Sequence, residues 1–176
     1  MASNREIRIP ADSILALRRS LTHQLGAAAA AQALQEAGHA AGDVLHDRLA
    51  RGNAGDGLGS LPTDTFWTRL GSLFREAGWG TVEHEELHPG VGALVARDWF
   101  EVDPDTRRPS CFFTTGVLAN ILGRVAGGEV AVLQVECATS EPGCCRFLFG
   151  SGPVLQEVYA ALRDGRDLET SLGALG

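Results

Sequence analysis

The first third of the chain has apolar residues three and four positions apart, which is the spacing of one face of a helix. We expect helices throughout residues 12–51, with Asp12 or Ser13 as the N-terminal cap. Gly38 and Gly42 interrupt the pattern, and two glycines four residues apart indicate either a break or close packing of another backbone. The apolar stripe of the first helix consists of Ile14, Leu17, Leu21, Leu25 and Ala28.

A glycine-rich segment separates these helices from a shorter one. Residues 52–60 have the composition of a flexible linker. A third helix is expected to start near Thr63 or Asp64 and to end at Gly78. Its predicted buried face consists of Trp67, Leu70, Phe74 and Ala77.

The rest of the chain contains strand-like runs around one long helical pattern. The strands are expected at residues 81–87, 92–99, 130–135 and 145–149, the long helix between Ser110 and Gly127, and a last helix at 153–163. Residues 165–176 are expected to be frayed. The order of elements predicts an α+β fold with an antiparallel sheet of about four strands packed against helices. We expect one domain over residues 1–176, with its core at 12–163.

Composition and charge exclude some classes of partner. The chain has 176 residues, of which 44% are hydrophobic, so a sizeable core is available. Its net charge of -7, without a basic cluster, argues against nucleic acid and anionic membrane as partners. The first residues lack a secretory signal, and no apolar run is long enough to span a bilayer. We therefore expect a cytoplasmic protein with reduced thiols.

All four cysteines lie between residues 111 and 145. Cys111 opens the predicted long helix, and Cys137 ends one strand of a hairpin whose other strand begins at Cys144 and Cys145. The short connection brings Cys137 near Cys145. Four cysteines in a reducing compartment favour a metal site, which would be structural, over disulfides. The alternative is that they are small buried hydrophobic residues.

Several motifs, in this order and spacing, resemble the 4-vinyl reductase domain family. They are Gly78-Trp79-Gly80, Arg97-Asp98-Trp99-Phe100-Glu101, Pro109-Ser110-Cys111-Phe112, Gln134-Val135-Glu136-Cys137 and Cys145. That family includes sensor domains of aromatic-responsive bacterial activators and is distantly related to the TRAPP tethering subunits. The resemblance covers about residues 20–150 and implies a ligand-binding α+β fold.

The resemblance also implies a zinc ion. In the aromatic sensors, three cysteines and one glutamate hold zinc, and the cysteine positions fall on Cys111, Cys137 and Cys145. The glutamate position falls on Gln134, whose neutral amide is a poorer ligand. The fourth ligand is therefore left open between Cys144, Glu136 and water, and loss of the metal is the alternative.

A pocket for a small apolar molecule, between the sheet and its helices, follows from the same resemblance. The tryptophan that binds the phenol hydroxyl in relatives falls on Ala96, which favours a larger and less polar ligand. The candidate lining residues are Leu94, Ala96, Thr115, Leu118, Ile121 and Val132. The alternative is that these residues are ordinary hydrophobic core.

The function expected from these observations is small-molecule binding or sensing. No nicotinamide, flavin or iron–sulfur motif is present, so reductase activity is not expected. The alternatives are a carrier or accessory protein of tetrapyrrole (bacteriochlorophyll) synthesis and a non-catalytic protein–protein adaptor. The resemblance implies a homodimer through the N-terminal helices, and a regulatory protein partner would be needed to carry a signal onward.

Overall fold

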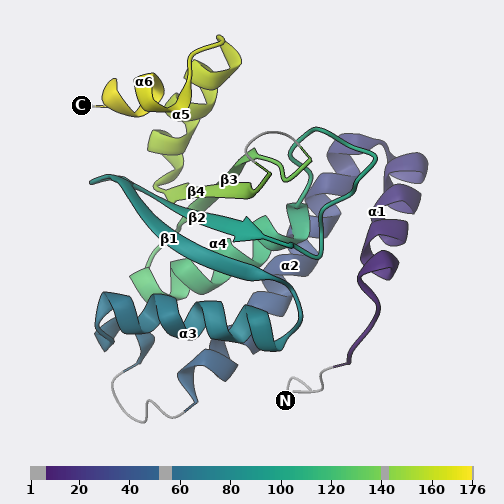
Figure 1. Cartoon of the computed structure of the whole chain (residues 1–176), viewed down its shortest axis with the longest axis horizontal. Helices are drawn as coiled ribbons and strands as arrows, with labels where there is room; N and C mark the ends of the chain where they lie inside the picture. The colour runs from purple at the N-terminus through teal and green to yellow at the C-terminus, as the bar shows by residue number, and fades with distance from the viewer. Residues whose placement is uncertain (1–6, 52–56, 140–142, 176) are drawn as a thin grey trace.

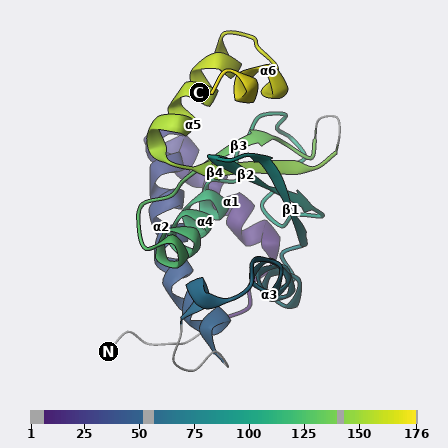
Figure 2. The ribbon, with the colours of Figure 1, turned by 90° about the vertical axis from the view of Figure 1, so that its left-hand side faces the viewer.

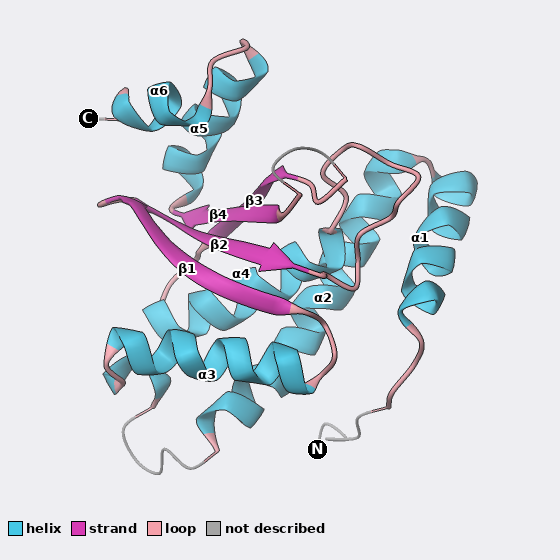
Figure 3. Ribbon diagram, viewed as in Figure 1, coloured by secondary structure: helices cyan, strands magenta, loops and turns pink. Residues whose placement is uncertain are grey.

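A computed structural model describes residues 7–51, 57–139 and 143–175 (Figures 1 and 3). The elements, in chain order, are α1 (Ala11–Leu25), α2 (Ala27–Ala50), the short 3-10 helix η1 (Leu58–Ser60), α3 (Thr63–Glu76), β1 (Thr81–His88), β2 (Val91–Arg97), α4 (Phe112–Ala126), β3 (Ala131–Glu136), β4 (Cys145–Gly150), α5 (Gly152–Arg163) and α6 (Leu168–Gly173). None of the helices in the described ranges is both long and apolar enough to cross a membrane.

The four strands form one antiparallel sheet in the order β1-β2-β4-β3. The predicted α+β class is thus confirmed. Successive side chains of a strand point to opposite faces, so Leu94 and its partner Phe147 face α4 while Ala93 and Leu148 face the other side. Because helices cover both faces, β2 is apolar and buried along almost its whole length.

Helices on the two sides of the sheet enclose separate hydrophobic clusters. Figure 2 shows α2, α3 and α4 on one side of the sheet and α5 and α6 on the other. The larger cluster lies between the sheet and α2, α3 and α4, and the smaller one joins the opposite face to Leu155, Val158 and Leu172. The segment beyond Gly165 is therefore not frayed as we expected, because α6 is capped by Asp167 and packs its Leu172 against α5 and the sheet.

Glycines let α2 and α4 lie in backbone contact. A Cβ atom at Gly38 would stand 2.0 Å from the carbonyl oxygen of Phe113, and one at Gly116 would stand 2.1 Å from that of Gln35. Of the two interpretations of Gly38 and Gly42, close packing is the one observed. The break in the helical segment lies instead at Gly26, whose φ of 84° favours glycine.

Two expectations for chain segments differ from the structure. Neither Asp12 nor Ser13 caps α1, because the helix begins directly after Pro10 without a side-chain cap. Residues 52–56 of the expected linker lie outside the described ranges. Its last three residues form the helix η1, in which the Leu58 side chain is buried and only 3% exposed.

We expect Gly38→Ala to destabilise the protein by about 2–4 kcal/mol, because the added methyl group forces α2 away from the α4 backbone. This loss should outweigh the gain in helix propensity of about 1 kcal/mol. Chemical denaturation measures the free energy of unfolding. Gly152→Ala is the control, because no heavy atom lies within 4 Å of its Cβ position. A Gly38→Ala protein as stable as the wild type would show that the two helices do not pack this closely.

Candidate functional site

The N-terminus of α4 is buried and its backbone N–H groups are satisfied from distant parts of the chain. The side-chain oxygen of Gln134 accepts the N–H groups of Ser110 and Cys111, both at 2.8 Å. The carboxylate of Glu101 accepts those of Phe113 and Thr114, also at 2.8 Å. These four amides have no partner within the first turn of the helix, so the two side chains replace a local cap. We refer to this arrangement as the α4 junction.

Glu101 is fully buried within the α4 junction. Burial raises the pKa of its carboxyl group to about 7, although the hydrogen bonds from Thr114 and Phe113 and the charge of Arg18 oppose the shift. The Thr114 hydroxyl donates to the same carboxylate at 2.7 Å and accepts the indole N–H of Trp99 at 2.8 Å. Glu101 therefore connects the loop after β2 to the start of α4 through a continuous buried network.

Helix α1 reaches the same junction through Arg18, which is 7% exposed. Its guanidinium donates to the Ser110 hydroxyl at 2.9 Å and carbonyl at 3.2 Å, and forms an ion pair with Asp103. A hydrogen bond from Arg19, reinforced by Arg18, holds the pKa of Asp103 well below its usual range. The expected apolar stripe of α1 is thus largely exposed, with Leu17 at 49% and Leu25 at 55%, and a buried ion pair of Arg18 with Asp103 fixes the helix to the 98–110 loop instead.

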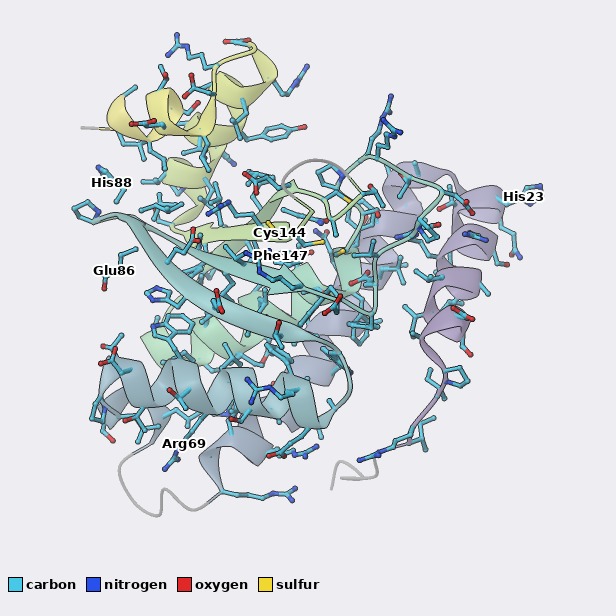
Figure 4. All side chains as sticks on the ribbon, viewed as in Figure 1. His23, Arg69, Glu86, His88, Cys144 and Phe147 are labelled. Atoms are coloured by element: carbon cyan, nitrogen blue, oxygen red, sulfur yellow. The ribbon has the colours of Figure 1, made fainter. Side chains whose placement is uncertain are left out.

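Three of the four cysteines come together beside the α4 junction. All four are reduced and buried. The thiols of Cys111 and Cys145 share a hydrogen bond, which raises the pKa of Cys111 and lowers that of Cys145 to about 7, and Cys137 also hydrogen-bonds Cys145. The sulfur atoms appear in yellow near Cys144 in Figure 4. The sequence-based placement of Cys137 near Cys145 agrees with this geometry.

The two side chains expected as alternatives for the fourth metal ligand contact each other elsewhere. The pairing of β3 with β4 is irregular between Gln134 and Glu136, so these residues do not share a face as they would in a regular strand. The carboxylate of Glu136 instead accepts from Arg146 at 3.1 Å and faces the Cys144 thiol at 3.8 Å. Neither Cys144 nor Glu136 is therefore directed at Cys111.

The residues present do not fit a closed four-coordinate zinc site. Within the described ranges, no group of three or more His, Cys, Asp or Glu side chains is arranged to hold a metal ion. The Gln134 oxygen already accepts two backbone N–H groups, and its amide nitrogen donates to the Cys111 sulfur at 3.5 Å. The zinc expected at Cys111, Cys137 and Cys145 therefore has no support among the described residues.

The candidate pocket residues from the sequence fall in two places. Thr115 and Val132 line an open groove of about 330 Å³ beside Gln35 and His39. The other four belong to the packed hydrophobic core and do not border this groove: Leu94, Ala96, Leu118 and Ile121. The structure thus does not gather the six residues around one cavity.

A second, more apolar pocket of about 270 Å³ lies at the other end of α4 and is lined by none of these six residues. Its lining comes from η1 and the residues after it, from α3, from the C-terminal part of α4, from the residue before β3 and from the inner strand β4: Leu58, Gly59, Leu61, Thr63, Phe66, Trp67, Leu122, Val125, Ala126, Val130 and Phe149. We refer to it as the η1 pocket. Except for Thr63 and Trp67, its side chains are hydrocarbon.

Trp67 is the polar feature of the η1 pocket. Its indole N–H is buried and has no hydrogen-bond partner within the described residues. The ring is fixed by stacking on His84 at 4.1 Å between centroids and by an edge contact with Phe66 at 4.8 Å. Burial lowers the pKa of His84, so this imidazole is neutral at neutral pH. A buried donor without a partner is uncommon and calls for an explanation.

Sequence reasoning placed Trp67 on the buried face of its helix but missed the pocket. The missed signal was the pair Leu58 and Leu61 in a segment otherwise rich in glycine and polar residues. Two leucines in such a segment indicate that it packs against the core. Val125 and Leu122 belong to the long helix that the sequence did predict, here α4.

The fold is of the class in which a buried helix packs against an antiparallel sheet. No protein-family model matches the chain, and no curated protein matches it by sequence. Similar solved structures do exist, and three of them share its fold.

The phenol-responsive sensory domain of the transcription activator PoxR, solved with phenol, has a TM-score of 0.67 and 18% identity, covering 93% of this chain and 85% of that one. A vinyl-4-reductase family protein from Methanocaldococcus jannaschii has a TM-score of 0.51 and 17% identity, covering 82% and 83%. Trafficking protein particle complex subunit 3 from Naegleria fowleri, covalently bound to palmitic acid, has a TM-score of 0.58 and 13% identity, covering 80% and 89%. The resemblance drawn from the sequence is thus confirmed for the fold.

We expect Glu101→Gln to change how stability depends on pH. The folded-state pKa of about 7 lies above the usual 4.5, so the folded protein binds a proton that the unfolded chain does not between these values. The contribution of this group is complete below pH 4.5 and is lost as the pH rises through 7. The free energy of unfolding of the wild type, relative to that of Glu101→Gln, should therefore fall by about 3 kcal/mol at most between pH 4.5 and 8.

Urea denaturation of both proteins at several pH values measures this difference. The quantity that tests the prediction is the change with pH in the stability difference between the two proteins, since other groups titrate equally in both. A difference that stays constant with pH would contradict the buried, proton-binding state of Glu101.

Proposed function

We propose that this chain binds a small, uncharged and largely apolar molecule in the η1 pocket, with a hydrogen-bond acceptor on the ligand meeting the indole N–H of Trp67. The observation that carries the proposal is that Trp67, whose buried indole N–H has no hydrogen-bond partner among the described residues, lines a pocket that is otherwise almost wholly hydrocarbon. A buried donor without a partner costs about 1–3 kcal/mol. A ligand that accepts the hydrogen bond would remove that cost and bury its own apolar surface.

The surroundings of Trp67 favour an uncharged ligand. The stacked His84 is neutral at neutral pH because burial lowers its pKa, and the lining residues of the η1 pocket carry no charged group. An anion or a cation would therefore lose its hydration without gaining an ion pair. The stacked and edge-on aromatic contacts hold the indole in place, so the donor is oriented before a ligand arrives.

The residues that line the η1 pocket support ligand binding without catalysis. Thr63 is the one hydroxyl among the lining residues, which include no thiol, carboxylate or imidazole that could act as a base. Reductase activity therefore has no support from this pocket.

Two of the similar structures support ligand binding by this fold. The PoxR domain was solved with phenol, and the trafficking subunit is covalently bound to palmitic acid. A sensor role for this chain is the proposal that follows, with a partner protein to receive the signal. The η1 pocket is at the small end of the range for small-molecule sites, which disfavours a tetrapyrrole carrier. The cytoplasmic location stays a prediction, and a cysteine-ligated zinc forms no part of this proposal.

A homodimer through α1 is the second element of the proposal. Exposed apolar side chains on and before this helix support it, with Ile9 at 50%, Leu17 at 49% and Leu25 at 55% exposure. An isolated exposed leucine is ordinary, but two on one helix with an isoleucine before it form a surface that a second copy could cover. An adaptor role would use the same surface for a different protein.

Calorimetric titration with two matched probes tests the η1 pocket. 1-Tetralone and tetralin have the same bicyclic frame, but only the ketone carries an acceptor. We expect the wild type to bind the ketone about fivefold more tightly, since one hydrogen bond contributes about 1 kcal/mol. Trp67→Phe should bring the two affinities together, because it keeps an aromatic ring and removes the N–H.

A variant with a larger side chain in the η1 pocket provides the complementary test of ligand binding. Val125→Trp should weaken binding of both probes by at least about tenfold, a change of 1.4 kcal/mol. Thr115→Ser is the control, because Thr115 lines the separate groove near His39. The proposal would be wrong if neither probe bound at millimolar concentration, or if Val125→Trp left both affinities unchanged.

Light scattering tests the dimer. We expect the wild type to be dimeric at micromolar concentration and Leu17→Glu combined with Leu25→Glu to be monomeric, because two carboxylates would be buried in the interface. Tyr159→Glu on α5 is the control, since that residue is equally exposed at 50% but lies on another helix. A monomeric wild type would refute this element and leave the pocket proposal standing.

A further inference from the structure

The amide group of Gln134 uses all of its hydrogen-bonding capacity within the α4 junction. Its oxygen accepts the backbone N–H groups of Ser110 and Cys111 at 2.8 Å. Its nitrogen donates to the carbonyl oxygen of Glu136 at 3.1 Å and to the Cys111 sulfur at 3.5 Å. A side-chain amide has two acceptor sites and two N–H donors, so all four are occupied. No lone pair is left for a metal ion.

Three of the cysteine sulfurs also have partners of their own. Cys137 contacts the Thr139 hydroxyl at 3.3 Å, and Cys144 faces the Glu136 carboxylate at 3.8 Å. Cys111 accepts from the Gln134 amide at 3.5 Å. Three of the four thiols therefore have a partner other than a metal ion, although they lie in the part of the fold where the sequence resemblance implied a common metal.

The amide nitrogen stands between two electron-rich atoms. One of its N–H groups points at a carbonyl oxygen and the other at a sulfur. A glutamate in this position would place a negatively charged oxygen against both atoms. A divalent cation bound there would offset that repulsion, whereas a neutral amide meets the same two atoms with its own partial positive charge.

We propose that Gln134 takes the place of a metal ion in this chain, joining β3 to the start of α4 through its four hydrogen bonds and making the junction independent of zinc. The zinc-binding sensors have glutamate at this position and join these elements through a metal ion. This chain has glutamine and joins them through hydrogen bonds. The three clustered thiols remain unmetallated.

Zinc content of the wild type and Gln134→Glu tests the proposal. Both proteins are produced with added zinc, passed through a chelating column and analysed by inductively coupled plasma mass spectrometry. We expect less than about 0.1 zinc per wild-type chain and a Tm that EDTA does not change. Gln134→Glu should gain about one zinc per chain and a Tm that falls on chelation, because metal binding then contributes to folding.

Either of two results would overturn the proposal. One is a wild type that retains about one zinc per chain and loses stability with EDTA. The other is a Gln134→Glu protein that stays metal-free, because the glutamine would then not be what excludes the ion.

The hydrogen-bonding role of Gln134 has a separate measurement. Gln134→Ala leaves buried N–H groups of α4 unpaired and should lower Tm by about 5–10 °C with or without EDTA. Gln32→Ala is the matched control, because that glutamine is exposed and bonds only Glu36 within its own helix. A Tm for Gln134→Ala within about 1 °C of the control would show that the amide does not join these elements.

Discussion

The structure depends on how the first turn of α4 is satisfied. A helix begins with backbone N–H groups that have no partner of their own, and burying them unpaired is costly. The start of α4 is buried at Cys111, and Glu101 and Gln134 supply the acceptors from either side. Both acceptors come from distant elements. Pairing the first N–H groups of α4 therefore fixes the relative positions of the loop after β2, of β3 and of α4.

Other contacts follow from a fixed α4. Arg18 bonds Ser110, two residues before the helix, and so ties α1 to it, and glycines on α2 and α4 allow their backbones to touch. The apolar face of α4 covers the sheet, and its last turn forms one wall of the η1 pocket. The pocket is therefore held by the same helix whose first turn is anchored at the cysteines, at the opposite end.

The sequence predicted the parts of the fold that depend on periodicity. Alternation gave the strands within two residues of their observed ends, and helical spacing gave α3, α4 and α5. The proximity of Cys137 and Cys145 followed from a short hairpin. Glycine spacing left two interpretations at Gly38, and only the position of α4 decides between them. These features are local, or nearly so, and need no knowledge of distant contacts.

The remaining features depend on contacts across the chain. An irregular pairing turns Glu136 away from Gln134, which no residue-by-residue pattern indicates. Arg18 looks like a solvent-exposed residue of an amphipathic helix until Asp103 and Ser110 are placed beside it. The η1 pocket combines a segment that reads as a linker with the far end of α4. In each case the decisive partner is more than 20 residues away or depends on a strand irregularity.

Amide hydrogen exchange of the α4 junction, followed by NMR, tests this account most directly. The N–H groups of Ser110, Cys111, Phe113 and Thr114 would exchange rapidly at an ordinary helix start, because water reaches them. The account predicts that all four exchange as slowly as the amides in the middle of α4, with Gln134 and Glu101 as their acceptors. Exchange of these four amides at the rate of an exposed first turn would contradict it.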